Sequence, residues 1–147
     1  MHILIMCIGN IDGGDDAAGP YIAKKIDKEK GKIDVIDCGT IPENYTSIVK
    51  KKNPEKLIII DAVDMNLEAG EIRIIPKDSI GQMHISTHGI PISVLIGYLE
   101  QYIKDIIIVG IQPKTMIGKM TDNVKASCDF LIKKIKIDEI DDIKKLK

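Results

Sequence analysis

Continuous runs of apolar residues, separated by amphipathic stretches, divide the chain into predicted strands and helices. An unbroken apolar run is typical of a strand whose two faces are both covered in a parallel sheet. We expect such buried strands at residues 2–8, 33–36, 57–60 and 106–111. Residues 71–75 alternate between polar and apolar side chains and are closed by Pro76, which predicts an edge strand.

Between these strands, apolar residues recur at helical spacing. We expect one helix that begins at Asp15 and Asp16, and others at residues 45–51, 92–103 and 121–135. In the third of these, one broad face carries Val94, Leu95, Tyr98, Leu99, Tyr102 and Ile103. That pattern predicts a helix packed on the core by this face. Residues 82–91 have the composition of a loop.

The order of these elements predicts an α/β fold, a three-layer α/β/α sandwich with a mostly parallel twisted sheet of about five strands. A length of 147 residues suits one domain with one core. We expect a single α/β domain over residues 1–135. The remaining residues, 136–147, are rich in Lys, Asp and Glu and are expected to form a charged, partly ordered tail.

Composition excludes several classes of partner. The net charge of −1 gives no reason to expect nucleic acid or an anionic membrane surface. No apolar run approaches the roughly 20 residues that span a bilayer, and no cationic leader precedes the first strand, so we expect a cytoplasmic protein. The three cysteines, Cys7, Cys38 and Cys128, are too far apart for a C-x-x-C metal knuckle and odd in number. They are expected to be small buried side chains.

A glycine-rich turn joins the first strand to the first helix. Glycines at such a junction often bind phosphate, but Gly9 to Gly14 matches neither G-x-G-x-x-G nor a Walker A loop. Asp15 and Asp16 would also repel an anion at the helix start, so a cation is the better ligand. The structural alternative is that Asp15 caps the helix and Asp16 only complements its dipole.

Polar groups that follow the parallel strands should gather at one edge of the sheet. They are Asp15 and Asp16 after the first strand, Asp61 and Asp64 after the third, and His88 in the loop at 82–91. Two carboxylates and an imidazole can bind a divalent cation such as Ni²⁺ or Zn²⁺ with positions left open. We choose Asp16, Asp61 and His88, although His88 taken alone is more typical of a loop histidine bonded to the backbone.

Familiar hydrolase motifs are missing. His84 and His88 have the spacing of an H-E-x-x-H zinc peptidase, but Ile85 replaces its glutamate, and Gly89 with Pro91 opposes a helix there. The chain also lacks the G-x-S-x-G elbow of serine hydrolases, and neither Cys38 nor Ser86 has an identifiable base. The residues alone therefore predict an α/β protein with a cation site.

Three segments of the chain match a known family in their order and spacing. They are the opening G-N-x-x-x-x-D-D-x-x-G at residues 9–19, the strand that ends in Asp61 and Ala62, and Ser86-Thr87-His88. Residues 42–44, 70–75 and 110–113 support the match. With these motifs the chain resembles the hydrogenase maturation endopeptidases, which process the large subunit of nickel-iron hydrogenases. It is most similar to the subgroup that serves formate-hydrogenlyase-type complexes.

The resemblance implies a protease that removes the C-terminal extension of a nickel-iron hydrogenase large-subunit precursor after nickel insertion. It assigns Asp16, Asp61 and His88 both the catalytic and the metal-contacting roles, with nickel supplied by the precursor. Many relatives carry Glu where this chain has the shorter Asp16, although Asp also occurs in the subgroup. A monomer is expected, because the enzyme must enclose a larger partner. The alternative is a non-catalytic, nickel-dependent docking or chaperone protein, which would need the same three ligands.

Overall fold

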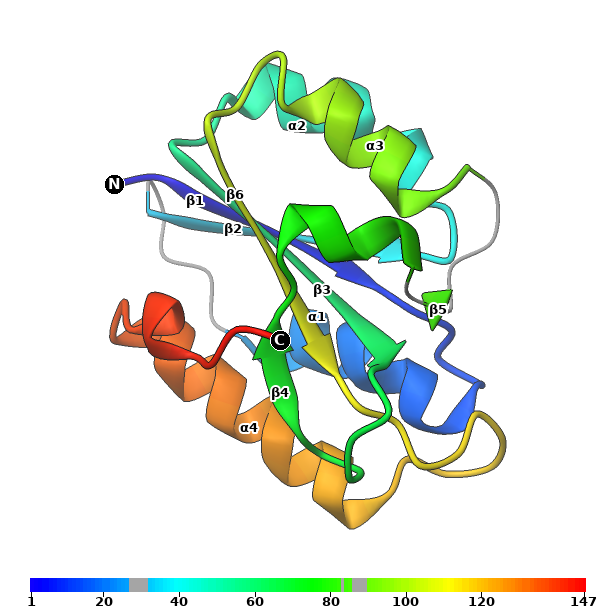
Figure 1. The fold of residues 1–147 in the computed structure, drawn as a ribbon. Coiled ribbons are helices and arrows are strands. Elements are labelled where there is room, and N and C mark those ends of the chain that lie inside the picture. Colours follow the sequence, from blue (N-terminus) through cyan, green and yellow to red (C-terminus); the bar gives the residue numbers. More distant parts are fainter. Residues whose placement is uncertain (27–31, 83, 86–89) are drawn as a thin grey trace.

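A mostly parallel sheet forms the middle of the molecule (Figure 1). The structure is a computed structural model that describes residues 1–26, 32–82, 84–85 and 90–147. Within these residues the parallel strands are β1 (Ile3–Ile8), β2 (Ile33–Gly39), β3 (Lys56–Asp64) and β6 (Asp105–Ile111). The antiparallel strand β4 (Ile72–Ile74) lies at one edge, in the order β2-β1-β3-β6-β4. The carboxyl ends of the four parallel strands therefore share one edge.

Helices cover both faces of this sheet, which confirms the predicted three-layer fold (Figure 1). One face carries α1 (Ala18–Lys25) and α4 (Asp122–Lys136), and the other carries α2 (Thr46–Lys52) and α3 (Ile92–Leu99). Short 3-10 helices are η1 (Gly14–Ala17), η2 (Pro42–Tyr45), η3 (Lys77–Gln82) and η4 (Ile140–Asp142). No helix in the described part of the chain is long and apolar enough to cross a membrane.

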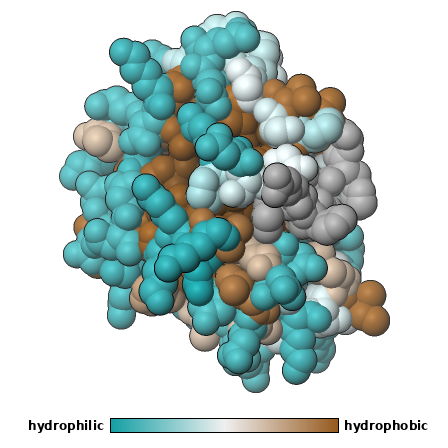
Figure 2. All heavy atoms as spheres, in the orientation of Figure 1, coloured by the Kyte–Doolittle hydropathy of each residue, from teal (hydrophilic) through white to brown (hydrophobic). Residues whose placement is uncertain are grey.

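Side chains of the central strands point alternately into two cores. In β1, Leu4 and Met6 join the apolar cluster beneath α2 and α3, whereas Ile3 and Ile5 join the cluster beneath α1 and α4. Every residue of β1 is buried, which confirms the prediction of a strand covered on both faces. Hydrophilic residues cover most of the outer surface in Figure 2, with apolar residues visible in a band between them.

Two strands differ from the predicted elements. Strand β3 continues past Ile60 to Asp64, so Asp61 and Asp64 belong to the strand and do not follow it. In this extension Asp61 and Ala62 still pair with β6, whereas Val63 and Asp64 pair with β5 (His84–Ile85), an antiparallel strand within the segment that composition predicts as a loop. These pairings supply the backbone partners that allow β3 to continue beyond its apolar run.

The predicted core face of α3 is too broad. Leu95 and Leu99 are fully buried, as expected. In contrast, the exposed fraction is 55% for Val94, 38% for Tyr98 and 45% for Tyr102. The helix ends at Leu99. The segment is apolar on several sides, so the sequence pattern could not show which side meets the sheet.

The segment after α4 packs against the edge strand. Ile140 and Ile143 are buried, with 1% and 9% exposure. The N–H of Ile74 in β4 donates to the carbonyl of Lys144 (2.8 Å), and its carbonyl accepts from the N–H of Leu146 (2.8 Å). These contacts cover part of the free edge of β4.

A buried lysine links this segment to the amino-terminal edge of the sheet. Lys56, at the start of β3, is only 3% exposed. Its Nζ lies 2.6 Å from Asp141 and 3.8 Å from Asp105. Burial makes an uncompensated ammonium costly, so these two carboxylates stabilise the charge.

We expect Asp141→Ala to lower the free energy of unfolding by about 1–2 kcal/mol, because Lys56 then keeps only its longer contact with Asp105. The exposed neighbour Asp142 provides the matched control Asp142→Ala. Denaturant unfolding and amide hydrogen exchange at Ile140 and Ile143 measure the effect. Equal losses in both variants would contradict a role for the Lys56 contact.

Candidate functional site at the carboxyl edge of the sheet

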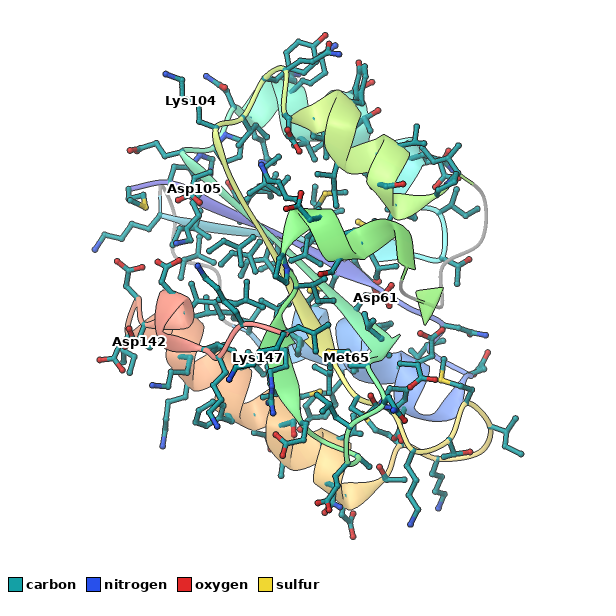
Figure 3. The ribbon with its side chains drawn as sticks, viewed as in Figure 1. Asp61, Met65, Lys104, Asp105, Asp142 and Lys147 are labelled. Carbon is teal, nitrogen blue, oxygen red and sulfur yellow. The ribbon has the colours of Figure 1, made fainter. Side chains whose placement is uncertain are left out.

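Asp61 lies near the end of β3, where it is only 2% exposed. Its pairing partner on the neighbouring strand β6 is Gly110. Figure 3 shows Asp61 at the end of the sheet close to β5, whereas Asp105 and Asp142 lie toward the opposite end. The apolar run of β3 therefore delivers a buried carboxylate to the carboxyl edge, where open α/β sheets place their ligands.

Asp16 reaches the same edge from a different element. It lies in η1, the 3-10 turn that follows β1 and packs against β3, and it is 5% exposed. Its Oδ2 accepts a hydrogen bond from the N–H of Asn10 (3.0 Å). The structure thus brings Asp16 and Asp61, two buried carboxylates distant in sequence, to one region.

The close approach of η1 to the end of β1 requires glycine. At Gly9, where φ is +152°, a Cβ atom would lie 2.0 Å from the carbonyl oxygen of Asp16. At Gly14, where φ is +61°, a Cβ atom would lie 2.7 Å from the carbonyl oxygen of Ile117. The glycine-rich turn therefore positions an acidic residue through close backbone packing.

Asp15 has a structural role that the sequence did not indicate. It is fully buried, and its carboxylate accepts hydrogen bonds from the N–H groups of Lys114 (2.8 Å), Thr115 (3.2 Å) and Thr121 (2.7 Å). The hydroxyl of Thr121 also donates to it. Asp15 therefore holds the loop between β6 and α4. The structural alternative in which Asp15 caps its own helix is wrong, because η1 and α1 have no side-chain cap.

The hydrogen bonds also determine the charge of Asp15. Burial alone would raise the pKa of its carboxyl group. The N–H groups of Thr121, Lys114 and Thr115 and the Thr121 hydroxyl outweigh burial and hold this pKa below its ordinary value. Asp15 is accordingly ionised at neutral pH.

Asp64 differs from Asp61 in both burial and partners. It lies at the exposed end of β3, where its Oδ1 accepts from the N–H of Asn66 (3.1 Å) and from Nε2 of Gln112 (3.2 Å). Alternation along the strand directs Asp61 and Asp64 to opposite faces. Asp64 therefore helps to shape the turn after β3.

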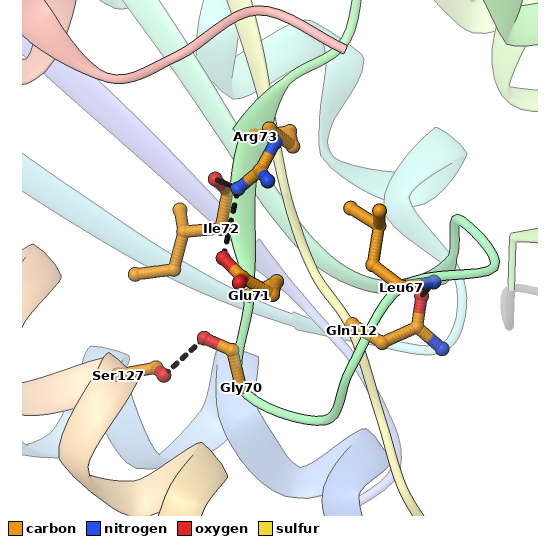
Figure 4. Close-up of polar contacts among 7 residues, drawn as sticks. All are labelled: Leu67, Gly70, Glu71, Ile72, Arg73, Gln112 and Ser127. Atoms are coloured by element: carbon orange, nitrogen blue, oxygen red, sulfur yellow. Dashed lines mark hydrogen bonds and ion pairs between the residues drawn. The ribbon is translucent and has the colours of Figure 1, made fainter.

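Gln112 holds this turn in place, which the sequence analysis missed. The side chain follows β6 and is 6% exposed, and its Oε1 accepts from the N–H groups of Met65 (2.6 Å) and Leu67 (3.2 Å). Figure 4 shows the contact with Leu67, and beside it the hydroxyl of Ser127 donating to the carbonyl of Gly70. The signal available in the sequence was a glutamine directly after an apolar strand.

We expect Gln112→Leu to lower the free energy of unfolding by about 2 kcal/mol, because the substitution leaves two backbone N–H groups without their acceptor. Gln112→Glu is the matched comparison, since it keeps the acceptor oxygen and loses the amide donor. Thermal unfolding measures both. If the two variants are equally destabilised, the acceptor oxygen is not what holds the turn.

The third predicted ligand, His88, lies outside the described residues. His84, at the other end of the H-x-x-x-H spacing, lies in β5, as expected for a segment that is not a zinc-peptidase helix. Across residues 1–26, 32–82, 84–85 and 90–147, no three or more His, Cys, Asp or Glu side chains form a group that could hold a metal ion. The described site consequently supplies two carboxylates, and His88 remains a prediction.

The cysteines do not contribute a nucleophile. All three are free and buried. Burial raises the pKa of Cys38, the one nearest the carboxyl edge, to about 12, so its thiol stays protonated. Two carboxylates can provide oxygen ligands for a divalent cation or act as a general base, and these are the chemical options of the site.

Comparison with known proteins identifies the family. Residues 20–137 match the family model described as hydrogenase maturation protease. The hydrogenase 3 maturation protease of Escherichia coli K12 is 39% identical over 140 residues, which cover 92% of this chain and 89% of that protein. The solution structure of an endopeptidase from Escherichia coli is 36% identical, with a TM-score of 0.89 over 100% of this chain and 97% of that one.

A more distant structure agrees. The crystal structure of a nickel-iron hydrogenase maturation protease from Thermococcus kodakarensis is 28% identical, with a TM-score of 0.82, and the match covers 94% of this chain and 92% of that one. The matches to these three relatives cover 92% or more of the chain, and the match to the family model includes Asp61 but begins at residue 20, after Asp16. The chain belongs to the hydrogenase maturation protease family and is a hydrolase that acts on peptide bonds.

Proposed function

We propose that this protease removes the C-terminal extension of a nickel-iron hydrogenase large-subunit precursor after nickel has been inserted. Asp16, Asp61 and His88 contact nickel that the precursor carries, so cleavage depends on completed metal insertion. The observation that supports this proposal is the pair of buried carboxylates, Asp16 and Asp61, at the carboxyl edge of the sheet. An incomplete set of protein ligands leaves positions for groups of the precursor.

The residues of the chain position the substrate and accept protons. Asp61 lies on a central strand whose neighbours are buried, so its carboxylate has little freedom to move. The N–H of Asn10 donates to Oδ2 of Asp16 and so helps to orient this carboxylate, which is 5% exposed. Either carboxylate can accept the proton of a water molecule that attacks the scissile carbonyl. When bound, nickel would polarise that carbonyl or activate the water.

The decisive experiment is intact mass spectrometry of a cognate precursor incubated with the protein, with and without prior nickel loading. We expect loss of a C-terminal peptide from the nickel-loaded precursor alone. Cleavage of both forms would overturn the dependence on nickel. Nickel-dependent binding with no change in mass would overturn proteolysis of this precursor and favour a docking role.

A further inference from the structure

Two loops beside the candidate site present large apolar side chains to solvent. Ile11 is 70% exposed in the turn after β1, and Ile117 and Met116 are 78% and 41% exposed in the loop after β6. In Figure 2, apolar atoms protrude at the right-hand edge over the loop that joins β6 to α4. Single exposed isoleucines are common, but three such side chains on two neighbouring loops form a candidate contact surface.

Both loops are fixed in place. In the first, the N–H of Gly13 donates to the carbonyl of Asn10 (3.0 Å), and the N–H of Asp12 donates to its side chain (2.9 Å). In the second, the buried carboxylate of Asp15 binds three backbone N–H groups. Exposed loops with so many internal hydrogen bonds present their apolar tips at little entropic cost, which favours binding.

The two loops also border the same turn, η1, which carries Asp15 and Asp16. Asn10, next to Ile11, donates its N–H to Asp16. The N–H of Asp15 donates to the carbonyl of Thr115 (2.8 Å), two residues before Ile117. Both loops therefore flank the turn that carries Asp16, one of the two carboxylates to which we assign the cleavage.

We propose that Ile11, Met116 and Ile117 form a docking surface for the folded body of the precursor, in addition to contacts with its C-terminal extension. This inference rests on the proposed function for the identity of the partner. An extended peptide is normally bound by a groove or by a free strand edge. The tips are instead protruding and apolar, with Asp12, Lys114 and Lys119 around them. An apolar centre with a polar rim fits a hollow in a folded protein surface.

The test measures cleavage of the nickel-loaded precursor by the double variant Ile11→Ser/Ile117→Ser. We expect KM to rise about 100-fold, about tenfold for each isoleucine, with kcat within about twofold of the unchanged protein. The control is Ile137→Ser, because Ile137 is 54% exposed in the segment after α4, beside residues at the amino-terminal edge of the sheet. We expect it to leave both constants unchanged.

Other outcomes separate this inference from the proposed function. An unchanged KM in a double variant that cleaves normally overturns the docking surface and leaves the proteolytic function intact. Failure of the unchanged protein to cleave any nickel-loaded precursor overturns the proposed function instead. The isolated extension peptide can also be added as a competitor of cleavage. If it inhibits the unchanged protein but not the double variant, the surface binds the extension and not the folded body. A dimer of the unchanged protein in analytical ultracentrifugation, abolished in the variant, would assign it to a second copy.

Discussion

Replacing Asp61 with asparagine is expected to reduce kcat/KM for the nickel-loaded precursor by more than about 100-fold, while the protein stays folded. Removal of even an outer partner of a metal ligand costs about 10–100-fold, and a direct contact should cost more. Asparagine keeps the shape of the buried side chain but removes its charge and most of its basicity. Asp16→Asn is expected to have the same effect. The measurement is the rate of peptide release, followed by intact mass.

The matched control is Asp142→Asn, which removes the same charge from an exposed position toward the opposite end of the sheet from Asp61 (Figure 3). We expect it to retain the full rate. A second measurement, equilibrium binding of the nickel-loaded precursor, should weaken in Asp16→Asn and Asp61→Asn. Normal processing by either variant would remove that carboxylate from the mechanism.

Asp15→Ala is expected to lower the free energy of unfolding by about 3 kcal/mol and to impair cleavage. The substitution leaves three backbone N–H groups of the loop after β6 without their acceptor, and each lost bond to a charged group is costly. Hydrogen exchange at Lys114, Thr115 and Thr121 should rise with the loss of stability. Asp122→Ala, an exposed position beside Thr121, is the control and should change little.

The pH dependence of stability provides an independent check on Asp15. Its pKa is lowered in the folded protein, so ionisation stabilises the fold at pH values above the unfolded pKa of about 3.9. That contribution should be lost as the pH falls from about 3.9 toward the lower folded pKa. In Asp15→Asn, this part of the acid destabilisation should disappear. An unchanged acid profile would show that other groups control stability in this range.

Secondary structure and layer architecture were largely predictable from the sequence. The apolar runs of β1, β3 and β6 could only be strands covered on both faces, and the order of strands and helices then required a three-layer fold. The carboxyl-edge position of Asp61 followed from the same reasoning, because parallel strands end at one edge. Asp16 and Asp61 are both buried, and their selection as site residues stays a prediction.

The local sequence pattern could not predict which side of a helix is buried when several of its sides are apolar. Nor could it predict how far a strand continues beyond its apolar run. The sequence of α3 is apolar on several sides, and only packing on the sheet decided that Leu95 is buried and Tyr98 exposed. The length of β3 depended on pairing with β5, a strand too short to have a recognisable pattern.

The adjacent acids Asp15 and Asp16 show most clearly where sequence information ends. With three residues per turn in η1, neighbouring side chains point about 120° apart, so only one of the two can face the site. The two adjacent acids in the sequence indicated that a carboxylate of this turn should face the site, but not which one. The choice depended on backbone N–H groups 99 to 106 residues further along the chain, which the folded sheet brings to Asp15 and not to Asp16. A buried carboxylate adopts the direction in which its charge is hydrogen-bonded, and only the tertiary structure places those donors.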